Sequence, residues 1–150
     1  MKINGVIQKK LAIMDERVSW LETRFASESF EAFRSSWELQ AAAERGLQIA
    51  IEVVIDVAER LLALHGRGPV ASAAEAIRKC VELGVLDSEE PFTAMIGFRN
   101  FIVHQYDAID SRITFDILQH HLGAFRHFRD CIDRWKPEAS GRRSESEREE

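Results

Sequence analysis

The chain has 150 residues, of which 45% are hydrophobic and 30% charged, and its formal net charge is −5. This size and composition fit one globular domain with a core of its own. The acidic balance excludes broad, sequence-independent binding to nucleic-acid backbones, because such binding rests on many Lys and Arg contacts. A nucleic-acid role would therefore need a local basic patch, although each candidate is also typical of a solvated helix face. The candidates are Lys9, Lys10, Arg67, Arg78, Lys79, Arg112, Arg126 and Arg129.

The two cysteines, Cys80 and Cys131, lie far apart and have no C-x-x-C partner. Neither a disulfide framework nor a thiolate metal site is indicated, and we expect both thiols to be reduced and packed. The first residues carry a charge every few positions, and no apolar run is long enough to span a bilayer. A cytoplasmic location is the expectation.

Apolar residues recur at alternating spacings of four and three from Ile7 to Phe25, which predicts a helix of roughly six turns. Ser27 and Ser29 interrupt this pattern. A second, long helix is predicted from Phe30 to about Leu61, with Gly46 as the candidate position for a break. Residues 49–57 are rich in β-branched side chains and imitate a buried strand, but their surroundings are helical, so we assign them to this helix.

Residues 65–69 hold two glycines and a proline and are predicted to form a loop. Ser72 with Glu75 matches a capping box, and Gly84 suits a helix C-terminus, which predicts a third helix between them. Asp87 and Ser88 are predicted to cap a fourth helix, with Pro91 in its first turn, that continues to Val103.

A fifth helix is predicted to begin after Asp110 and Ser111 and to reach Trp135. Beyond Lys136 the sequence lacks large apolar residues, so it is predicted to be disordered. The predicted fold is all-α: an antiparallel bundle of about five helices over residues 1–135, followed by a disordered, charged tail over 136–150.

Most enzyme classes that a motif would reveal are excluded, because glycine-rich phosphate loops, G-x-S-x-G elbows, H-E-x-x-H pairs and paired C-x-x-C motifs are absent. His120, His121 and His127 are predicted on the last helix, where the first and third share a face. No acidic residue on that face completes a ligand set, so we predict no metal site.

Arg99 stands in the middle of a helical stripe formed by Phe92, Met95, Ile102 and Tyr106, so a guanidinium interrupts an apolar face. A desolvated cation requires an anionic partner. Two carboxylates are the only charges between positions 49 and 58, and at i,i+4 they lie side by side on the second helix. These are Glu52 and Asp56. We expect one of them to orient Arg99 or the segment that bears His104; the alternative is a solvated acidic face.

At these residues the sequence resembles a known family. Arg99 and His104, with Asn100 after the arginine and Tyr106 two residues beyond the histidine, resemble the R-x4-6-H motif of HEPN domains in its R-x4-H-x-Y form. That form is similar to the HepT-like toxins of bacterial toxin-antitoxin pairs. The similarity extends across most of residues 1–135 and includes the run from Ile51 to Asp56 in a preceding helix.

The resemblance implies a homodimeric, metal-independent endoribonuclease without a cofactor, with Arg99 and His104 as its catalytic pair. It also implies a partner antitoxin, a minimal nucleotidyltransferase that in this family can attach AMP to the motif tyrosine, here Tyr106. The residue types agree with RNA cleavage by the 2′-hydroxyl. Histidine suits proton transfer near neutral pH, and arginine suits bidentate stabilisation of phosphate oxygens.

One histidine per chain is poorly placed to act as base on one side of the phosphate and as acid on the other, so we expect a two-fold dimer that brings two motifs to one cleft. Five residues of an ideal helix turn about 500°, so we predict that the helix ends or distorts before His104. Asn100 is expected to hydrogen-bond across the cleft or to substrate. AMP on Tyr106 would repel RNA and switch the enzyme off.

Two other interpretations stay open at this point. The first is a non-catalytic helical adaptor that binds a nucleotidyltransferase or a nucleotide, with Arg99 and His104 as structural or ligand-holding groups. The second is a generic helical dimerisation module, which would explain the heptad-like first helix but leaves Arg99 in an apolar stripe unexplained.

Overall fold

The computed structural model describes residues 5–104 and 110–136. Within these residues the chain forms seven α-helices and no strand. They are α1 (Gly5–Phe25), α2 (Phe30–Arg34), α3 (Trp37–Leu64), α4 (Ala73–Leu83), α5 (Phe92–His104), α6 (Ser111–His120) and α7 (Gly123–Arg134). The predicted all-α class is confirmed. The predicted number of about five helices is too low, because two of the expected helices are each divided in two.

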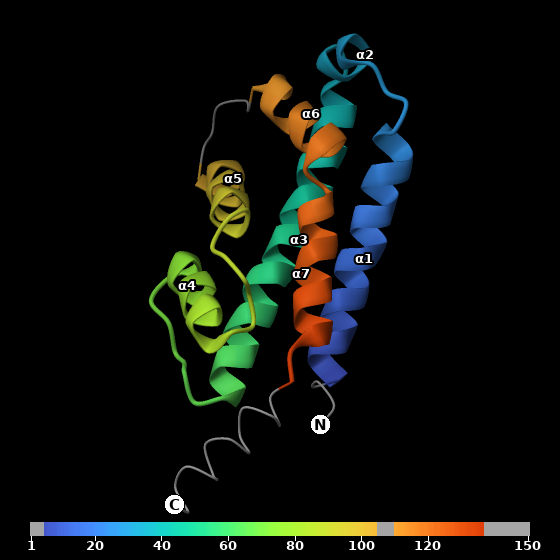
Figure 1. The fold of residues 1–150 in the computed structure, drawn as a ribbon. Helices are drawn as coiled ribbons and strands as arrows, with labels where there is room; N and C mark the ends of the chain where they lie inside the picture. Colours follow the sequence, from blue (N-terminus) through green and yellow to red (C-terminus); the bar gives the residue numbers. More distant parts are fainter. Residues whose placement is uncertain (1–4, 105–109, 137–150) are drawn as a thin grey trace, which may run out of the picture.

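The 28-residue helix α3 is the centre of the fold and contacts each of the other helices. α1 and α7 run along one side of it, α4 and α5 lie on the other side, and α2 and α6 cover one end (Figure 1). The predicted stripe of α1, from Ile7 to Phe25, is buried along its whole length. The β-branched run of residues 49–57 is helical, as predicted, and most of its side chains belong to the core.

The second predicted helix is interrupted at Ser35 and Ser36, so the prediction of Gly46 as a break is wrong. The Ser36 hydroxyl accepts a hydrogen bond from the backbone of Leu39 at 3.1 Å and caps the start of α3. Gly46 lies inside α3, where a Cβ atom would stand 3.0 Å from Leu21 Cδ2. The glycine therefore permits α1 and α3 to approach closely.

The caps of α4 agree with the sequence. Ser72 Oγ accepts from the backbone N–H of Glu75 at 3.1 Å, and the Glu75 carboxylate accepts from the backbone N–H of Ala71 at 2.6 Å. The latter bond holds the pKa of Glu75 below its usual range. Gly84 ends the helix at φ +90°, in the left-handed region that favours glycine. The loop over 65–69 also lies between helices, as predicted.

The cap predicted for the fourth helix is wrong, because α5 begins only at Phe92. The Asp87 carboxylate is hydrogen-bonded to His127 of α7, which lowers the pKa of Asp87, and the Ser88 hydroxyl donates to the carbonyl of Glu90. Both side chains thus have partners other than the start of a helix.

The fifth predicted helix is also divided. Asp110 caps α6, as predicted, by accepting from the backbone N–H of Arg112. α6 stops at His120 and α7 starts at Gly123, a residue type that costs about 1 kcal/mol in a helix interior. The domain boundary at residue 135 and the disordered tail stay predictions, because residues 137–150 lie outside the described part of the chain. No described helix is both long and apolar enough to cross a bilayer.

Candidate active site

Arg99 occupies the side of α5 that lies towards the rest of the bundle. Met95, Ile96 and Phe98 around it are buried, whereas the Arg99 side chain is half-buried. Its Nε atom is buried and has no hydrogen-bond partner among the described residues. The sequence pattern is therefore correct in placing a guanidinium within an otherwise apolar part of this helix.

A polar cavity of about 410 Å³ brings Arg99 together with three carboxylates of α3. Glu52 and Asp56, the two partners expected from the sequence, line this cavity with Arg99, and so does Glu59. The segment 70–73 that leads into α4 closes another side. The sequence analysis did not select Glu59, although its spacing of seven from Glu52 and three from Asp56 places all three on one helical face.

The three carboxylates line the same cavity as Arg99 but do not pair with it. Within the described residues, no hydrogen bond or ion pair joins the guanidinium to any of the three. Asp56 instead pairs with Lys10 at 2.5 Å and with Arg60 at 3.3 Å, and Glu52 accepts a hydrogen bond from Gln48 at 3.3 Å. Within the described residues, the guanidinium of Arg99 therefore keeps donors available to an anionic ligand in the cavity.

His104 is the last residue of α5 and is exposed. The prediction that the helix ends or distorts before His104 is wrong, because α5 includes His104. Ile102, close to the end of this helix, still packs against the core. On a regular helix the two side chains then point about 140° apart. Asn100, between them, is exposed. Tyr106 lies outside the described residues.

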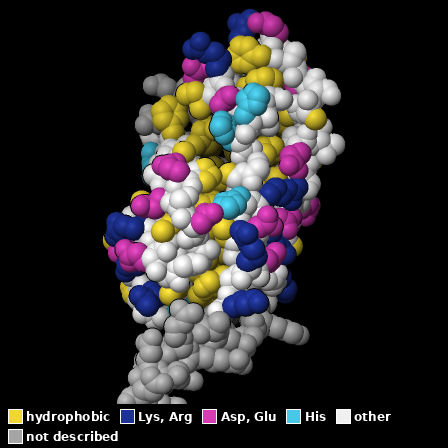
Figure 2. Space-filling view, in the orientation of Figure 1, with side chains coloured by type: hydrophobic (Ala, Val, Ile, Leu, Met, Phe, Trp, Pro, Cys, Tyr) yellow, Lys and Arg dark blue, Asp and Glu magenta, His cyan; other side chains and the backbone are white. Residues whose placement is uncertain are grey.

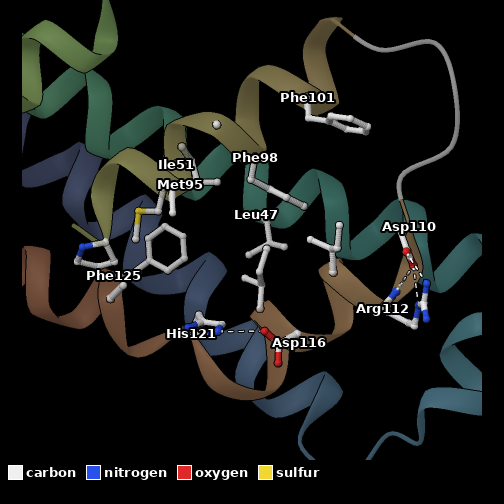
Figure 3. Close-up of a pocket in the computed structure, with 16 residues that line it drawn as sticks. Leu47, Ile51, Met95, Phe98, Phe101, Asp110, Arg112, Asp116, His121 and Phe125 are labelled. Atoms are coloured by element: carbon white, nitrogen blue, oxygen red, sulfur yellow. Dashed lines mark hydrogen bonds and ion pairs between the residues drawn. The ribbon is translucent and has the colours of Figure 1, made fainter. Parts of the chain in front are cut away.

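A second, apolar hollow of about 760 Å³ lies on the other side of α5, between α5, α6 and α7. Figure 2 shows hydrophobic side chains gathered around it. Phe98 and Met95 of α5 and Leu47 of α3 line it, and Asp110 lies at its edge with Arg112 (Figure 3). The Arg112 guanidinium holds the pKa of Asp110 below its usual range. The sequence analysis did not predict this hollow, because its walls come from helices far apart in the chain.

Most of the candidate basic patches are neutralised within the chain. Arg126 contacts Glu22 at 2.6 Å, and Arg129 contacts Asp15 at 3.0 Å, so these two arginines join α7 to α1. Lys79 pairs with Glu75 one turn away on the same helix, α4. Arg126 and Arg129 thus link two helices, Lys79 is neutralised within its own helix, and the three do not form a basic surface.

The fold and the motif define an all-α domain. Its Arg-x4-His pair lies at the end of α5, which packs against the helix α3 that carries the three carboxylates. The family model described as "Ribonuclease HepT-like" matches residues 14–132, and the chain belongs to this family. The resemblance found in the motif is therefore confirmed for the family and for the fold.

Two curated relatives are similar to this chain over most of its length. The mRNA nuclease HepT of Shewanella oneidensis is 24% identical over 132 residues, which cover 87% of this chain and 98% of the relative. The tRNA nuclease HepT of Aphanizomenon flos-aquae is 28% identical over 112 residues, 73% of this chain and 76% of the relative. Among solved structures, the tri-AMPylated Shewanella oneidensis HEPN toxin in complex with MNT antitoxin has a TM-score of 0.80 at 24% identity, with 87% and 98% of the two chains covered.

Proposed function

We propose that this chain is a metal-independent endoribonuclease and the toxin of a bacterial toxin-antitoxin pair, with Arg99 and His104 as its catalytic residues. The observation that carries the proposal is the state of Arg99, which belongs to the motif of a ribonuclease family and lines a polar cavity. Its guanidinium is half-buried, and its Nε has no hydrogen-bond partner among the described residues. A buried, unsatisfied donor is costly to a folded protein. A phosphate oxygen in the cavity would satisfy it once a turn of the side chain exposed this donor.

The proposed reaction is an attack of the ribose 2′-oxygen on the adjacent phosphorus. A histidine removes the 2′-hydroxyl proton, the bond from phosphorus to the 5′-oxygen breaks, and a second histidine delivers a proton to that oxygen. The products are a cyclic 2′,3′-phosphate and a free 5′-hydroxyl. Arg99 stabilises the additional negative charge on the phosphate oxygens in the transition state. No step requires a metal.

The geometry of α5 supports a dimeric site. Because Arg99 and His104 point about 140° apart on one helix, a single chain does not offer both side chains to one phosphate. Two chains related by a two-fold axis near the end of α5 could place the Arg99 of one beside the His104 of the other, with two histidines in a shared cleft. Asn100, exposed between them, would then donate to substrate or across the cleft.

Two apolar side chains next to the motif offer a surface for this dimer. Phe101 and Val103 are 42% and 44% exposed, although both belong to α5 close to His104. We expect Phe101→Ser to weaken dimerisation while leaving the monomer folded, since the side chain is only partly packed. As the protein concentration is lowered, the sedimentation coefficient and the cleavage rate should fall together. An active monomer at low concentration would contradict the dimeric site.

The proposed partner is a minimal nucleotidyltransferase antitoxin, as in the related toxin described in complex with MNT antitoxin. That toxin is tri-AMPylated, and we propose Tyr106 as the position modified here. Bulk and negative charge two residues from His104 would repel RNA. Mass spectrometry after co-expression with the cognate transferase should find AMP on a peptide containing Tyr106 and none on Tyr106→Phe. RNA as substrate makes the cytoplasm the expected site of action.

Cleavage of cellular RNA by the purified chain, in the presence of a chelator, tests the central proposal. Arg99→Ala should lower the rate by about 10²–10³-fold and His104→Ala by about 10²–10⁴-fold, and both should abolish growth arrest on expression. Matched controls are Arg34→Ala and His120→Ala, which remove an exposed arginine of α2 and an exposed histidine of α6. A folded wild type that binds the transferase but leaves RNA intact would favour the adaptor.

A further inference from the structure

Three side chains that can each bind a metal converge at the junction of α7 with the segment before α5. Asp87 lies in that segment, and His127 and Cys131 are one turn apart on α7. His127 Nε2 lies 3.1 and 3.0 Å from the two carboxylate oxygens of Asp87 and 3.6 Å from Cys131 Sγ. In the described part of the chain, no other group of three or more such residues brings its ligand atoms within 4.8 Å of one another.

The arrangement is not that of a Cys-His-Asp nucleophile. In such a relay the carboxylate holds one ring nitrogen and the sulfur faces the other. Here Asp87 and Cys131 both face Nε2 of His127. A neutral imidazole has at Nε2 either one proton or one lone pair, so it cannot make a full hydrogen bond to both. A cation between the three donor atoms would satisfy all of them together.

We propose that Asp87, His127 and Cys131 form a binding site for one divalent zinc-type ion. Thiolate, imidazole and carboxylate are the ligands that zinc takes in proteins, and the thiolate disfavours magnesium and calcium. Bonds of about 2.0–2.3 Å at tetrahedral angles place ligand atoms roughly 3.3–3.6 Å apart. The separations of 3.0 and 3.6 Å from His127 Nε2 need only a small adjustment, and the Asp87 and Cys131 donor atoms lie within 4.8 Å of each other. A water molecule would fill the fourth position.

The surroundings support the site. The Phe92 ring lies nearly parallel to the His127 imidazole, with 10° between the ring planes and 6.3 Å between the ring centroids. Cys131 is 5% exposed, whereas the side chains of Asp87 and His127 are 60% and 38% exposed, so an ion can enter from solvent. Arg134 Nη2 lies 3.9 Å from Cys131 Sγ, so the sulfur already accepts from a cationic donor.

The role that follows is structural. None of the three ligands lines the cavity around Arg99. A bound ion would join α7 to the segment that immediately precedes α5, the helix that carries Arg99 and His104. The site therefore fixes the start of that helix, and the proposed cleavage chemistry does not pass through it.

The test is a titration of the purified full-length chain, first stripped with a chelator, with zinc and separately with cobalt. Calorimetry should give one zinc per chain, and the melting temperature should rise by roughly 5–10 °C when free zinc is about 100 times its dissociation constant. The cobalt complex should absorb in the near ultraviolet through its thiolate bond. Asp87→Asn, His127→Gln and Cys131→Ser should each weaken binding by more than the roughly 10–100-fold that loss of an outer-shell partner costs.

The matched control is His121→Gln, since His121 forms a similar exposed pair with Asp116 at 3.1 Å but has no cysteine beside it. This variant should bind zinc like the wild type. Asp87→Asn changes an exposed residue and keeps the test valid if Cys131→Ser does not fold. The proposal is overturned if zinc does not bind one to one, if binding survives in Asp87→Asn and Cys131→Ser, or if cobalt shows no thiolate band. RNA cleavage by Arg99 and His104 is a separate measurement, so either proposal can fail alone.

Discussion

Alanine in place of Gly46 is expected to bring no stability to α3, although this exchange normally stabilises a helix interior by about 0.8–1 kcal/mol. The added Cβ would stand 3.0 Å from Leu21 Cδ2 and 3.3 Å from Leu21 Cγ, where carbon atoms normally rest about 3.5–4.0 Å apart. Leu21 has no exposed surface and little room to move. Overpacking of this kind costs about 1–3 kcal/mol, so the net change should lie between zero and a loss of about 2 kcal/mol.

Gly97→Ala is the matched control, because Gly97 is also inside a helix and a Cβ there meets no atom within 4 Å. It should gain the full propensity difference, roughly 0.5–1 kcal/mol. Urea denaturation of both variants measures the free energies of unfolding. In a Leu21→Ala background the clash disappears, so Gly46→Ala should then stabilise as well. Equal gains for Gly46→Ala and Gly97→Ala in the wild-type background would refute the close approach of α1 and α3.

Three further outcomes follow from the structure. Ser36→Ala should cost about 0.5–2 kcal/mol of unfolding free energy by removing the cap of α3, whereas Ser35→Ala should change it by less than about 0.5 kcal/mol, as measured by thermal and urea melts. The backbone N–H of Ala71 lowers the pKa of Glu75, so the carboxylate stabilises the fold at pH values above the ordinary pKa of glutamate. This stabilisation is lost as the pH falls through the lowered pKa. Glu75→Gln should thus be less stable than wild type at neutral pH and equal to it in acid. A difference in unfolding free energy that does not change with pH would contradict this. Burial raises the pKa of Cys80 to about 12, so iodoacetamide at pH 8 should label this thiol only after unfolding, as followed by mass spectrometry.

The helices were predictable where the local pattern and the tertiary structure agree. The stripe of α1 and both ends of α4 follow from spacing and capping chemistry that act within a few residues. The breaks were less predictable. Gly46 has a low helix propensity, but its lack of a side chain permits contact with Leu21, and such packing overrides propensity. The break near Ser36 depends on a single hydroxyl cap, which the sequence contains but does not distinguish from an exposed serine.

The candidate site shows the same division. Arg99 and His104 could be selected because they are close in sequence and interrupt a regular pattern. The proximity of Arg99 to Glu52 and Asp56 could be inferred from charge, since a cation on an apolar face requires anions. The pairing of Asp87 with His127 joins residues 40 positions apart, and neither residue stands out locally. Such a cluster depends on how α7 packs beside the segment before α5, which no periodicity encodes.

The acidic balance of the chain restricts how the proposed enzyme can hold RNA. Lys10, Arg126 and Arg129 are each paired with carboxylates of other helices, so their charge contributes to stability and little to a phosphate-binding surface. Arg99 differs from them, because among the described residues no carboxylate occupies the donors of its guanidinium. Affinity based on so few cations depends weakly on salt, and most of the selectivity must then come from the shape of the cleft and of the RNA. We therefore expect the proposed enzyme to bind RNA weakly in general and to cut it at few sites.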